Sequence, residues 1–335
     1  MTSTFFADAV LFDMDGTLTD SIAAVEAAWG KVAKDMGHDP EHVIAATHGK
    51  RAIDNLAQFK PHILSHQMDG EVQTFEESIL FFADAYANHG PGSRRSSSTS
   101  YIPESALDSR ATTPSLTSAN STPSSRTSSD VQSSRRPSFA TRLSDALIAV
   151  PNSEDRYIKV VDSPIEEDNG DEHFNDKTQL NQLEAWQIEA AAVDRSVRIL
   201  PGVKKMIESI PDGRYAVATS GAKTYAYGCM TRVGITPPPV TITADDKRLK
   251  AGKPAPDPFL LAAECLGFDP KNCVVFEDSP SGIQAGVASG AIVIAVCTSH
   301  ERSKIENCGA HFVVDDMEKV ECELVEGRLR FTILA

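Results

Sequence analysis

The sequence has few positive charges for its size. Its 335 residues include 32 Lys and Arg against 47 Asp and Glu, which gives a formal net charge of −15 at pH 7. Nonspecific binding to nucleic acids or to membrane surfaces depends on a basic footprint, so this balance argues against both kinds of partner. Hydrophobic residues still make up 41% of the chain, which is enough for a substantial core.

The sequence also lacks a C-x-x-C cysteine pair, a basic segment near its first residues and a long apolar run. Its six cysteines form no C-x-x-C pair, and the chain is far longer than the small secreted scaffolds that depend on disulfides. No basic segment precedes the first apolar residues, and no apolar run approaches the roughly 20 residues that a membrane-spanning helix needs. We therefore expect reduced thiols and a cytoplasmic location, with the nucleus as an alternative.

Serine is abundant, and it is concentrated in one segment. Residues 93–138 contain 17 Ser, 6 Thr and 4 Pro, types that cannot build a core. An acidic tract with a single apolar cluster follows at 152–176. We therefore predict that residues 93–176 form a disordered insertion. The rest of the chain is long enough for one catalytic domain with a smaller appended unit.

The insertion carries two arginine-flanked serine motifs, RRSS and RRPS, the second of which ends at Ser138. Motifs this short are common by chance, so two interpretations stay open. The insertion is either a segment that kinases phosphorylate or a passive spacer.

Short apolar runs alternate with helical patterns in the second half of the chain. The runs cover residues 215–219, 240–243, 273–276, 291–296 and 311–314, and an earlier run covers 9–12. This rhythm is typical of βαβ units, so we predict an α/β fold with a Rossmann-like parallel sheet and helices on both faces. The sequence VECELVEGRLRFTIL near the end predicts a closing hairpin that turns near Gly327.

About 200 residues separate the first predicted strand from the next, far more than an ordinary crossover needs. Apolar residues at helical spacing predict helices near 25–36, 71–88 and 180–193, on both sides of the insertion. A helical domain inserted after the first strand explains both features. The predicted organisation is an α/β core (1–20 and 198–335), a helical cap (21–92 and 177–197) and, within the cap, the disordered insertion (93–176).

Polar residues follow the predicted strands where each strand ends. They are Asp13, Asp15 and Gly16, then Thr219 and Ser220, then Lys253 across a loop, then Glu277 and Asp278. Ligands of open parallel sheets bind beyond the carboxyl ends of the strands, so we expect these residues to meet at one site. The carboxylates suit a hard cation such as Mg²⁺, and the absence of Cys and His from the cluster disfavours zinc. The hydroxyl, the lysine and the backbone amides near Gly16 and Ser220 are donors for a phosphoryl group.

Asp13 and Asp15 lie two residues apart, so they can take different roles in one reaction. With charge neutralised by the metal and Lys253, Asp13 can attack phosphorus and form an aspartyl-phosphate. Asp15 can then protonate the leaving oxygen and later deprotonate the attacking water. An isolated acidic pair is more often a solvated turn, and an isolated lysine is more often an exposed surface residue. Four motifs in order, each beyond a predicted strand, favour the catalytic interpretation.

The motifs DMDGTLTD, ATSG, GKP and FEDSPSGIQAGVASG resemble the four motifs of the haloacid dehalogenase-like superfamily, in the branch whose cap is inserted after the first motif. The resemblance implies that Asp13 is the nucleophile, Asp15 the general acid and base, and Thr219 and Lys253 phosphate binders. Dehalogenase members lack an acid at the Asp15 position, and transport ATPases of the superfamily carry Lys-Thr-Gly-Thr after the nucleophile. Since this chain keeps Asp15, the resemblance favours phosphate-ester chemistry.

The same resemblance implies a Mg²⁺ ion as cofactor. Its ligands would be Asp13, the backbone carbonyl of Asp15, and Asp278, with Glu277 supporting or ligating.

Two further stretches, PEHVIAATHGKRAIDNLAQFKP and YAVATSG, resemble fungal phosphatases that act on glycerol 3-phosphate or 2-deoxyglucose 6-phosphate. This resemblance implies hydrolysis of a small sugar or polyol phosphate monoester. It makes His48, Lys50 and Arg51, on a predicted cap loop, candidates for substrate contact, although a solvated cap surface explains them equally well.

Two other functions stay open. A phosphomutase of the β-phosphoglucomutase type shares every core motif and passes the phosphoryl group to a second sugar instead of water. A regulatory interaction protein that acts through the insertion would require a damaged catalytic set, whereas this set is complete.

Overall fold

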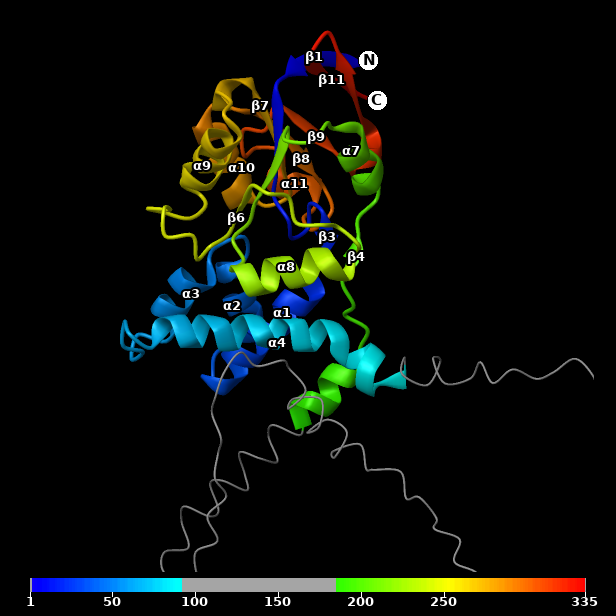
Figure 1. Cartoon of the computed structure of the whole chain (residues 1–335). Helices are drawn as coiled ribbons and strands as arrows, with labels where there is room; N and C mark the ends of the chain where they lie inside the picture. Colours follow the sequence, from blue (N-terminus) through cyan, green and yellow to red (C-terminus); the bar gives the residue numbers. More distant parts are fainter. Residues whose placement is uncertain (1, 92–184, 335) are drawn as a thin grey trace, which may run out of the picture.

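The computed structural model of the chain describes residues 2–91 and 185–334 (Figure 1). The predicted disordered insertion, 93–176, lies outside the described residues, and so do its serine motifs. Within the two described ranges, no helix has the length and apolar character that crossing a membrane requires.

A six-stranded parallel sheet forms the centre of the fold. Its strands are β2 (Ala9–Phe12), β5 (Tyr215–Ala218), β6 (Thr241–Ile242), β7 (Cys273–Glu277), β8 (Ile292–Val296) and β9 (Phe312–Val314). Their order in the sheet is β6-β5-β2-β7-β8-β9, and every pairing is parallel. The predicted parallel sheet is confirmed, with β6 and β9 shorter than the apolar runs that predicted them. All four residues of β2 are buried, as expected of a central strand covered on both faces.

Alternate residues of β2 enter two separate apolar clusters. Val10 and Phe12 lie in one cluster, and Ala9 and Leu11 lie in the other. Helices therefore cover both faces of the sheet, as predicted. The covering helices are α7 (Val203–Ser209), α8 (Lys223–Arg232), α9 (Asp257–Leu266), α10 (Pro280–Ser289) and α11 (Arg302–Ile305), with 3₁₀ turns at η2 (Pro270–Asn272) and η3 (Met317–Lys319).

A group of helices follows the first strand of the sheet, and we call them the cap helices. They are α1 (Ile22–Asp35), α2 (Pro40–Thr47), α3 (Ala52–Phe59) and α4 (Met68–His89). In Figure 1 they lie together at one end of the sheet, with α8 beside α4. Two short strands, β3 (Thr19–Asp20) and β4 (Arg198–Ile199), pair where the chain enters and leaves this region. The cap boundaries stay a prediction.

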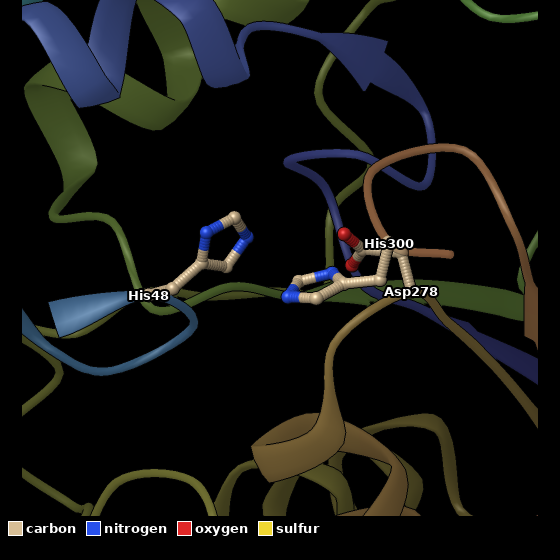
Figure 2. A group of neighbouring side chains, drawn as sticks. All are labelled: His48, Asp278 and His300. Carbon is tan, nitrogen blue, oxygen red and sulfur yellow. The ribbon is translucent and has the colours of Figure 1, made fainter. Parts of the chain in front are cut away.

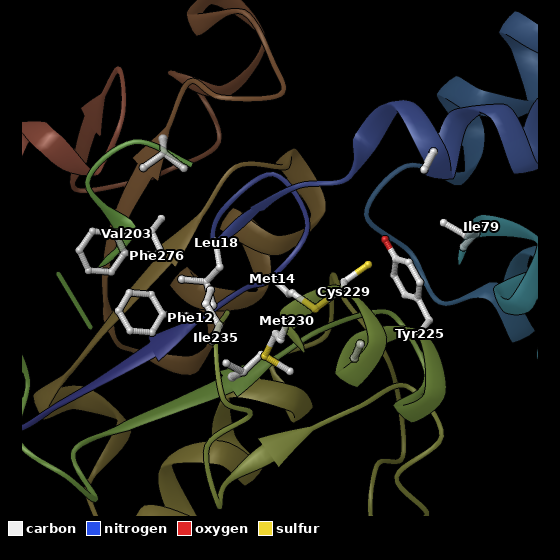
Figure 3. Close-up of a cluster of buried hydrophobic side chains, with 14 of the residues drawn as sticks. Phe12, Met14, Leu18, Ile79, Val203, Tyr225, Cys229, Met230, Ile235 and Phe276 are labelled. Atoms are coloured by element: carbon white, nitrogen blue, oxygen red, sulfur yellow. The ribbon is translucent and has the colours of Figure 1, made fainter. Parts of the chain in front are cut away.

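The first apolar cluster runs without a break from the sheet into the cap helices. Figure 3 shows Phe12 and Phe276 of the sheet, Tyr225 and Met230 of α8, and Ile79 of α4. The predicted helix at 71–88 is confirmed and begins slightly earlier, at the start of α4. A further helical stretch at 185–192 covers the described part of the predicted helix 180–193.

The chain ends in a small antiparallel sheet. Strands β10 (Val320–Val325) and β11 (Arg328–Ile333) form the predicted hairpin, which turns at Gly327. Strand β1 (Ser3–Ala7), which the sequence did not predict, pairs with β11 on its other edge.

Candidate active site

A buried ion network connects three of the strand-end residues. Lys253 Nζ donates to Asp13 Oδ1 and lies 2.6 Å from Glu277 Oε1. Asp13 follows β2, Glu277 ends β7, and each of the three side chains belongs to a residue less than 7% exposed. Buried charges of this kind persist only when they are paired, so the pairing itself fixes where the lysine and the two carboxylates lie.

Glu277 is further held by the start of α10. Its Oε2 accepts hydrogen bonds from the amides of Asp278 and Ser279, both at 2.9 Å, and from the Ser279 hydroxyl at 3.1 Å. A Cβ at Gly282 would lie 1.6 Å from Glu277 Oε1, so only glycine lets the first turn of α10 approach this closely. The first turn of α10 therefore packs directly against the Glu277 carboxylate and holds it in place.

Asp278 lies beside the first loop of the chain. Thr17 Oγ1 donates to Asp278 Oδ1 at 3.3 Å, and Ser299 Oγ donates to Asp278 Oδ2. Gly16 has a φ of +77°, and a Cβ there would lie 2.2 Å from Asp278 Oδ2. The Gly16 amide donates to the carbonyl of Thr19 at 2.7 Å. Gly16 thus allows the close approach of Asp278, but its own amide is not free to bind an anion, which differs from the sequence-based expectation.

Three of the predicted metal ligands meet at one point. Asp13, Glu277 and Asp278 each offer an oxygen, and these atoms all lie within 4.8 Å of one another. Burial raises the pKa of Asp13 to about 7, against the opposing effect of Lys253, and raises the pKa of Asp278 well above its usual range. One lysine cannot balance three buried carboxylates. An oxygen-only cluster with excess negative charge fits a hard divalent cation such as Mg²⁺.

Asp15 is held by two hydroxyl groups. Ser21 Oγ and Tyr225 Oη both donate to Asp15 Oδ1, each at 2.5 Å. Burial raises the pKa of Asp15, and the two hydrogen bonds act in the opposite direction. The carboxyl group faces a cavity with its orientation fixed by groups from α8 and from the residue before α1.

The two predicted phosphate-binding hydroxyls after β5 differ in position. Thr219 is 2% exposed, and its Oγ1 accepts a hydrogen bond from the Gly221 amide at 3.0 Å. Ser220 lines the cavity and donates to the carbonyl of Gly49, in the loop between α2 and α3, at 3.1 Å. Ser281, in α10, donates to the same carbonyl at 3.0 Å. The cap loop therefore rests directly on the sheet edge that carries the site.

A cavity of about 710 Å³, counting its open mouth, lies between the sheet edge and the cap helices. Asp13, Asp15, Lys253 and Asp278 line one wall. The facing apolar wall comes from the cap helices: Ile22, Val25, Trp29, Ile44, Phe75 and Ile79. A mostly apolar cavity with a few convergent polar groups is typical of a site for a small ligand.

The three cap residues that were candidates for substrate contact lie in different places. His48 lines the cavity, and Lys50 lies at its edge, where its Nζ donates to the carbonyl of Ala46 at 2.9 Å. Arg51 pairs with Asp54 at 2.8 Å and lines a neighbouring cavity instead. The structure thus brings His48 and Lys50 to the site but not Arg51.

Sequence reasoning missed four residues at this site: Glu76, Tyr225, Ser299 and His300. Ser299 and His300 lie three and four residues after the end of β8, in the loop that leaves the same edge of the sheet, so the polar residues of that loop were a signal that the sequence analysis did not use. No pattern in the sequence predicted that Tyr225 would lie at this site. Glu76 lies on the apolar face of α4. A charged residue at such a position needs a polar partner in the folded protein, so the sequence pattern could have identified it as a candidate site residue.

Glu76 is 2% exposed and accepts a hydrogen bond from the Ala222 amide, at the start of α8, at 2.5 Å. Burial raises its pKa to about 8, although this hydrogen bond acts in the opposite direction. His300 packs against His48, with ring centroids 4.4 Å apart. Burial lowers the pKa of both imidazoles, that of His300 to about 4. Both rings are therefore neutral near pH 7.

Comparison with known proteins agrees with this geometry. A family model described as haloacid dehalogenase-like hydrolase matches residues 129–290. Hexitol phosphatase A of Escherichia coli is 28% identical over 287 residues, which cover 85% of this chain and 81% of the relative.

Two yeast proteins are also similar. Glycerol-1-phosphate phosphohydrolase 2 of Saccharomyces cerevisiae is 34% identical over 157 residues, covering 44% of this chain and 61% of the relative. The 2-deoxyglucose-6-phosphate phosphatase 1 of the same yeast is 23% identical over 325 residues, covering 94% and 90% of the two chains.

In its fold, its strand-end carboxylates and these matches, the chain resembles the haloacid dehalogenase-like hydrolases. The names of these relatives describe phosphatases and a phosphohydrolase, which are enzymes that hydrolyse phosphoric monoesters.

Proposed function

We propose that this chain hydrolyses a small sugar or polyol phosphate through an aspartyl-phosphate intermediate, with Mg²⁺ as cofactor. The observation that carries the proposal is the convergence of Asp13, Asp15 and Lys253 on one cavity wall, although 238 residues separate Asp15 from Lys253. The names of the relatives support the substrate class, since they act on hexitol, glycerol and deoxyglucose phosphates.

Asp13 is the proposed nucleophile. Its Oδ1 accepts a hydrogen bond from Lys253, which keeps the carboxylate pointed at the cavity and offers a cation to the phosphoryl oxygens. Asp13, Glu277 and Asp278 would hold the Mg²⁺, together with the predicted backbone carbonyl of Asp15, and the ion would supply further positive charge for the phosphoryl group. Thr219 and Ser220 are proposed to position the phosphoryl oxygens.

Asp15 is the proposed general acid and base. Its pKa is raised by burial, which favours the protonated form that a leaving alkoxide needs. The hydrogen bonds from Ser21 and Tyr225 occupy only Oδ1, which leaves Oδ2 to meet the leaving oxygen.

The role of Asp15 can be tested by the choice of leaving group. We expect Asp15→Asn to lose about 10²–10⁴-fold in kcat with a polyol phosphate, whose alkoxide must be protonated. With p-nitrophenyl phosphate the loss should be much smaller, because that leaving group departs without a proton. Equal losses with both esters would contradict the assignment of Asp15 as general acid.

The cavity favours a compact substrate. Its cap wall is mostly apolar, and the polar residues there are Glu26, Thr47, His48, Lys50 and Glu76. A three- to six-carbon polyol or deoxyhexose presents few hydroxyls that would need partners, so it suits this wall better than a large phosphorylated molecule does.

The experiment that tests the proposal is phosphate release from a panel of polyol, deoxyhexose and hexose phosphates, with Mg²⁺ and with a chelator. We expect release from at least one small ester, and only with Mg²⁺. The mutase alternative predicts isomerised sugar phosphate and a requirement for a bisphosphate activator, which product analysis detects. If no member of the panel releases phosphate, the proposed substrate class is wrong.

A further inference from the structure

Two histidines from distant parts of the chain meet beside the candidate active site. His48 belongs to the loop between α2 and α3, and His300 belongs to the loop after β8. Figure 2 shows the His300 ring extended toward His48, with the Asp278 carboxylate next to it. One ligand atom from each of the three residues lies within 4.8 Å of the other two. The proposed phosphatase mechanism gives His300 no role.

This donor set shares Asp278 with the all-oxygen group that fits Mg²⁺ and differs from that group in its two imidazoles. Two imidazole nitrogens and one carboxylate oxygen are typical zinc ligands, and three protein ligands leave a fourth position for water. Imidazole is mostly neutral at pH 7.5, which is the form that binds metal ions.

A supporting hydroxyl orients two of the three ligands. Ser299 Oγ lies 2.8 Å from His300 Nδ1 and also donates to Asp278 Oδ2. Groups that bond to metal ligands in this way fix the ring and carboxylate orientation before the ion arrives. The arrangement is that of a partly prepared site rather than a chance contact of two rings.

We propose that His48, His300 and Asp278 form a second metal site, which takes Zn²⁺ or a similar transition-metal ion and ties the cap loop to the sheet edge. His48 comes from the cap side and the other two ligands come from the core, so one bound ion connects both walls of the cavity. The neighbouring Gly49 carbonyl already accepts hydrogen bonds from Ser220 and Ser281, which holds His48 near its two partners.

The site would regulate the enzyme. If the chain is the proposed phosphatase, substrate must enter and product must leave between the two walls, and a metal bridge across them slows both steps. Zinc should therefore inhibit turnover even at a Mg²⁺ concentration that saturates the acidic group.

Zinc binding is measured on the full chain, in millimolar Mg²⁺ and without substrate, by competition with a chelating dye. We expect His300→Asn to weaken binding by about 100-fold or more, and Ser299→Ala to weaken it by about 10-fold. His300→Cys should restore binding, because a thiolate is also a zinc ligand. His66→Asn removes an exposed histidine of the cap and serves as the matched control, with wild-type binding expected.

The outcomes separate this site from the Mg²⁺ group and from the phosphatase proposal. Binding that survives His300→Asn but is lost in Asp13→Asn would place the zinc in the acidic group and overturn the inference. A fall in binding with His66→Asn equal to that with His300→Asn would do the same. Because the measurement needs no substrate, its result stands whether or not any phosphate ester is hydrolysed.

Zinc should also raise the melting temperature of the wild-type chain more than that of His300→Asn. That readout compares each variant with and without the ion, so a change in the intrinsic stability of the variant does not affect it. An equal rise in both proteins would contradict the proposal.

Discussion

The two walls of the cavity are built in different ways. On the core wall, Asp13, Lys253 and Glu277 are less than 7% exposed and hold one another in ion pairs. On the cap side, Lys50 of the cavity wall and Arg51 just outside the cavity make their hydrogen bonds within the cap, to Ala46 and Asp54. The core wall is thus a fixed constellation in which each group needs the others, while the cap loop carries side chains that can change without unpairing a buried charge.

We infer from this difference that the two walls have different functions. A reaction that transfers a phosphoryl group depends mainly on positioning and charge, which a rigid and buried constellation provides. Selection among small esters depends on shape and on a few polar contacts, which a partly exposed loop can supply. The predictions below test this division by making matched changes on the two walls.

The largest effect is expected from Asp13→Asn. The change removes the proposed nucleophile at nearly constant volume, so we expect at least about a 10³-fold loss of phosphate release with the fold intact. Circular dichroism and thermal unfolding report on the fold. The matched control is Asp20→Asn, an exposed aspartate of β3, which should retain near wild-type rates. A wild-type rate in Asp13→Asn would remove the basis for the covalent mechanism.

A second pair of changes compares a buried cation of the core with a cation of the cap. Lys253→Met leaves Asp13 and Glu277 without their partner, so we expect the free energy of unfolding to fall by about 3–5 kcal/mol. Arg51→Met breaks an ion pair whose Asp54 partner is half exposed, and we expect a loss of about 1 kcal/mol or less. Urea unfolding measures both, and similar losses would show that the core and the cap do not hold their cations in the different ways described.

The core wall was largely predictable from the sequence because of a general property of parallel sheets. Their strands all end at the same edge, so a polar residue directly after a buried run, such as Asp13 or Asp278, must approach the others. The rule does not identify Ser299 and His300, which lie three and four residues beyond the end of β8. It also cannot reveal that the Gly16 amide is already used by Thr19, since that depends on the path of the loop.

The cap wall was less predictable because no such rule relates its residues. His48, Lys50 and Arg51 are close in sequence, yet only the first two reach the cavity. The direction of each side chain depends on where α2 ends and α3 begins, and neither helix was predicted. The hydrogen bond from the Ala222 amide to Glu76 joins residues 146 positions apart, and no local pattern encodes it.

The pH dependence of stability offers a test at the point where the two walls meet. The pKa of Glu76 is raised from 4.5 to about 8 by burial, so the folded chain holds this proton more tightly than the unfolded chain does. The resulting stabilisation is complete below about pH 4.5 and is lost as the pH rises through 8.

Glu76→Gln removes this titration. From pH 5 to pH 8, its free energy of unfolding should therefore rise relative to that of the wild type, by on the order of 2–4 kcal/mol. The control is Glu77→Gln, which makes the same chemical change at an exposed neighbour in α4. Chemical unfolding at several pH values measures the effect. A pH-independent difference for Glu76→Gln would mean that the carboxyl group is ionised throughout.

The smallest effects should come from one substitution made in a helix of each wall. In α10, Gly282→Ala places a Cβ within 1.6 Å of Glu277 Oε1, so the carboxylate must move away from Lys253 or the helix must shift. We expect a loss of about 1–3 kcal/mol in the free energy of unfolding, with a lower kcat because the lysine and Asp13 move too. In α4, Gly70→Ala meets no atom within 4 Å, and the better helix propensity of alanine should stabilise the chain by about 0.5–1 kcal/mol without changing kcat. If the free energy of unfolding falls in Gly282→Ala and rises in Gly70→Ala, the core wall tolerates no added methyl group at α10, whereas the cap tolerates one at α4. Equal signs would mean that the approach of α10 to Glu277 is looser than the structure shows.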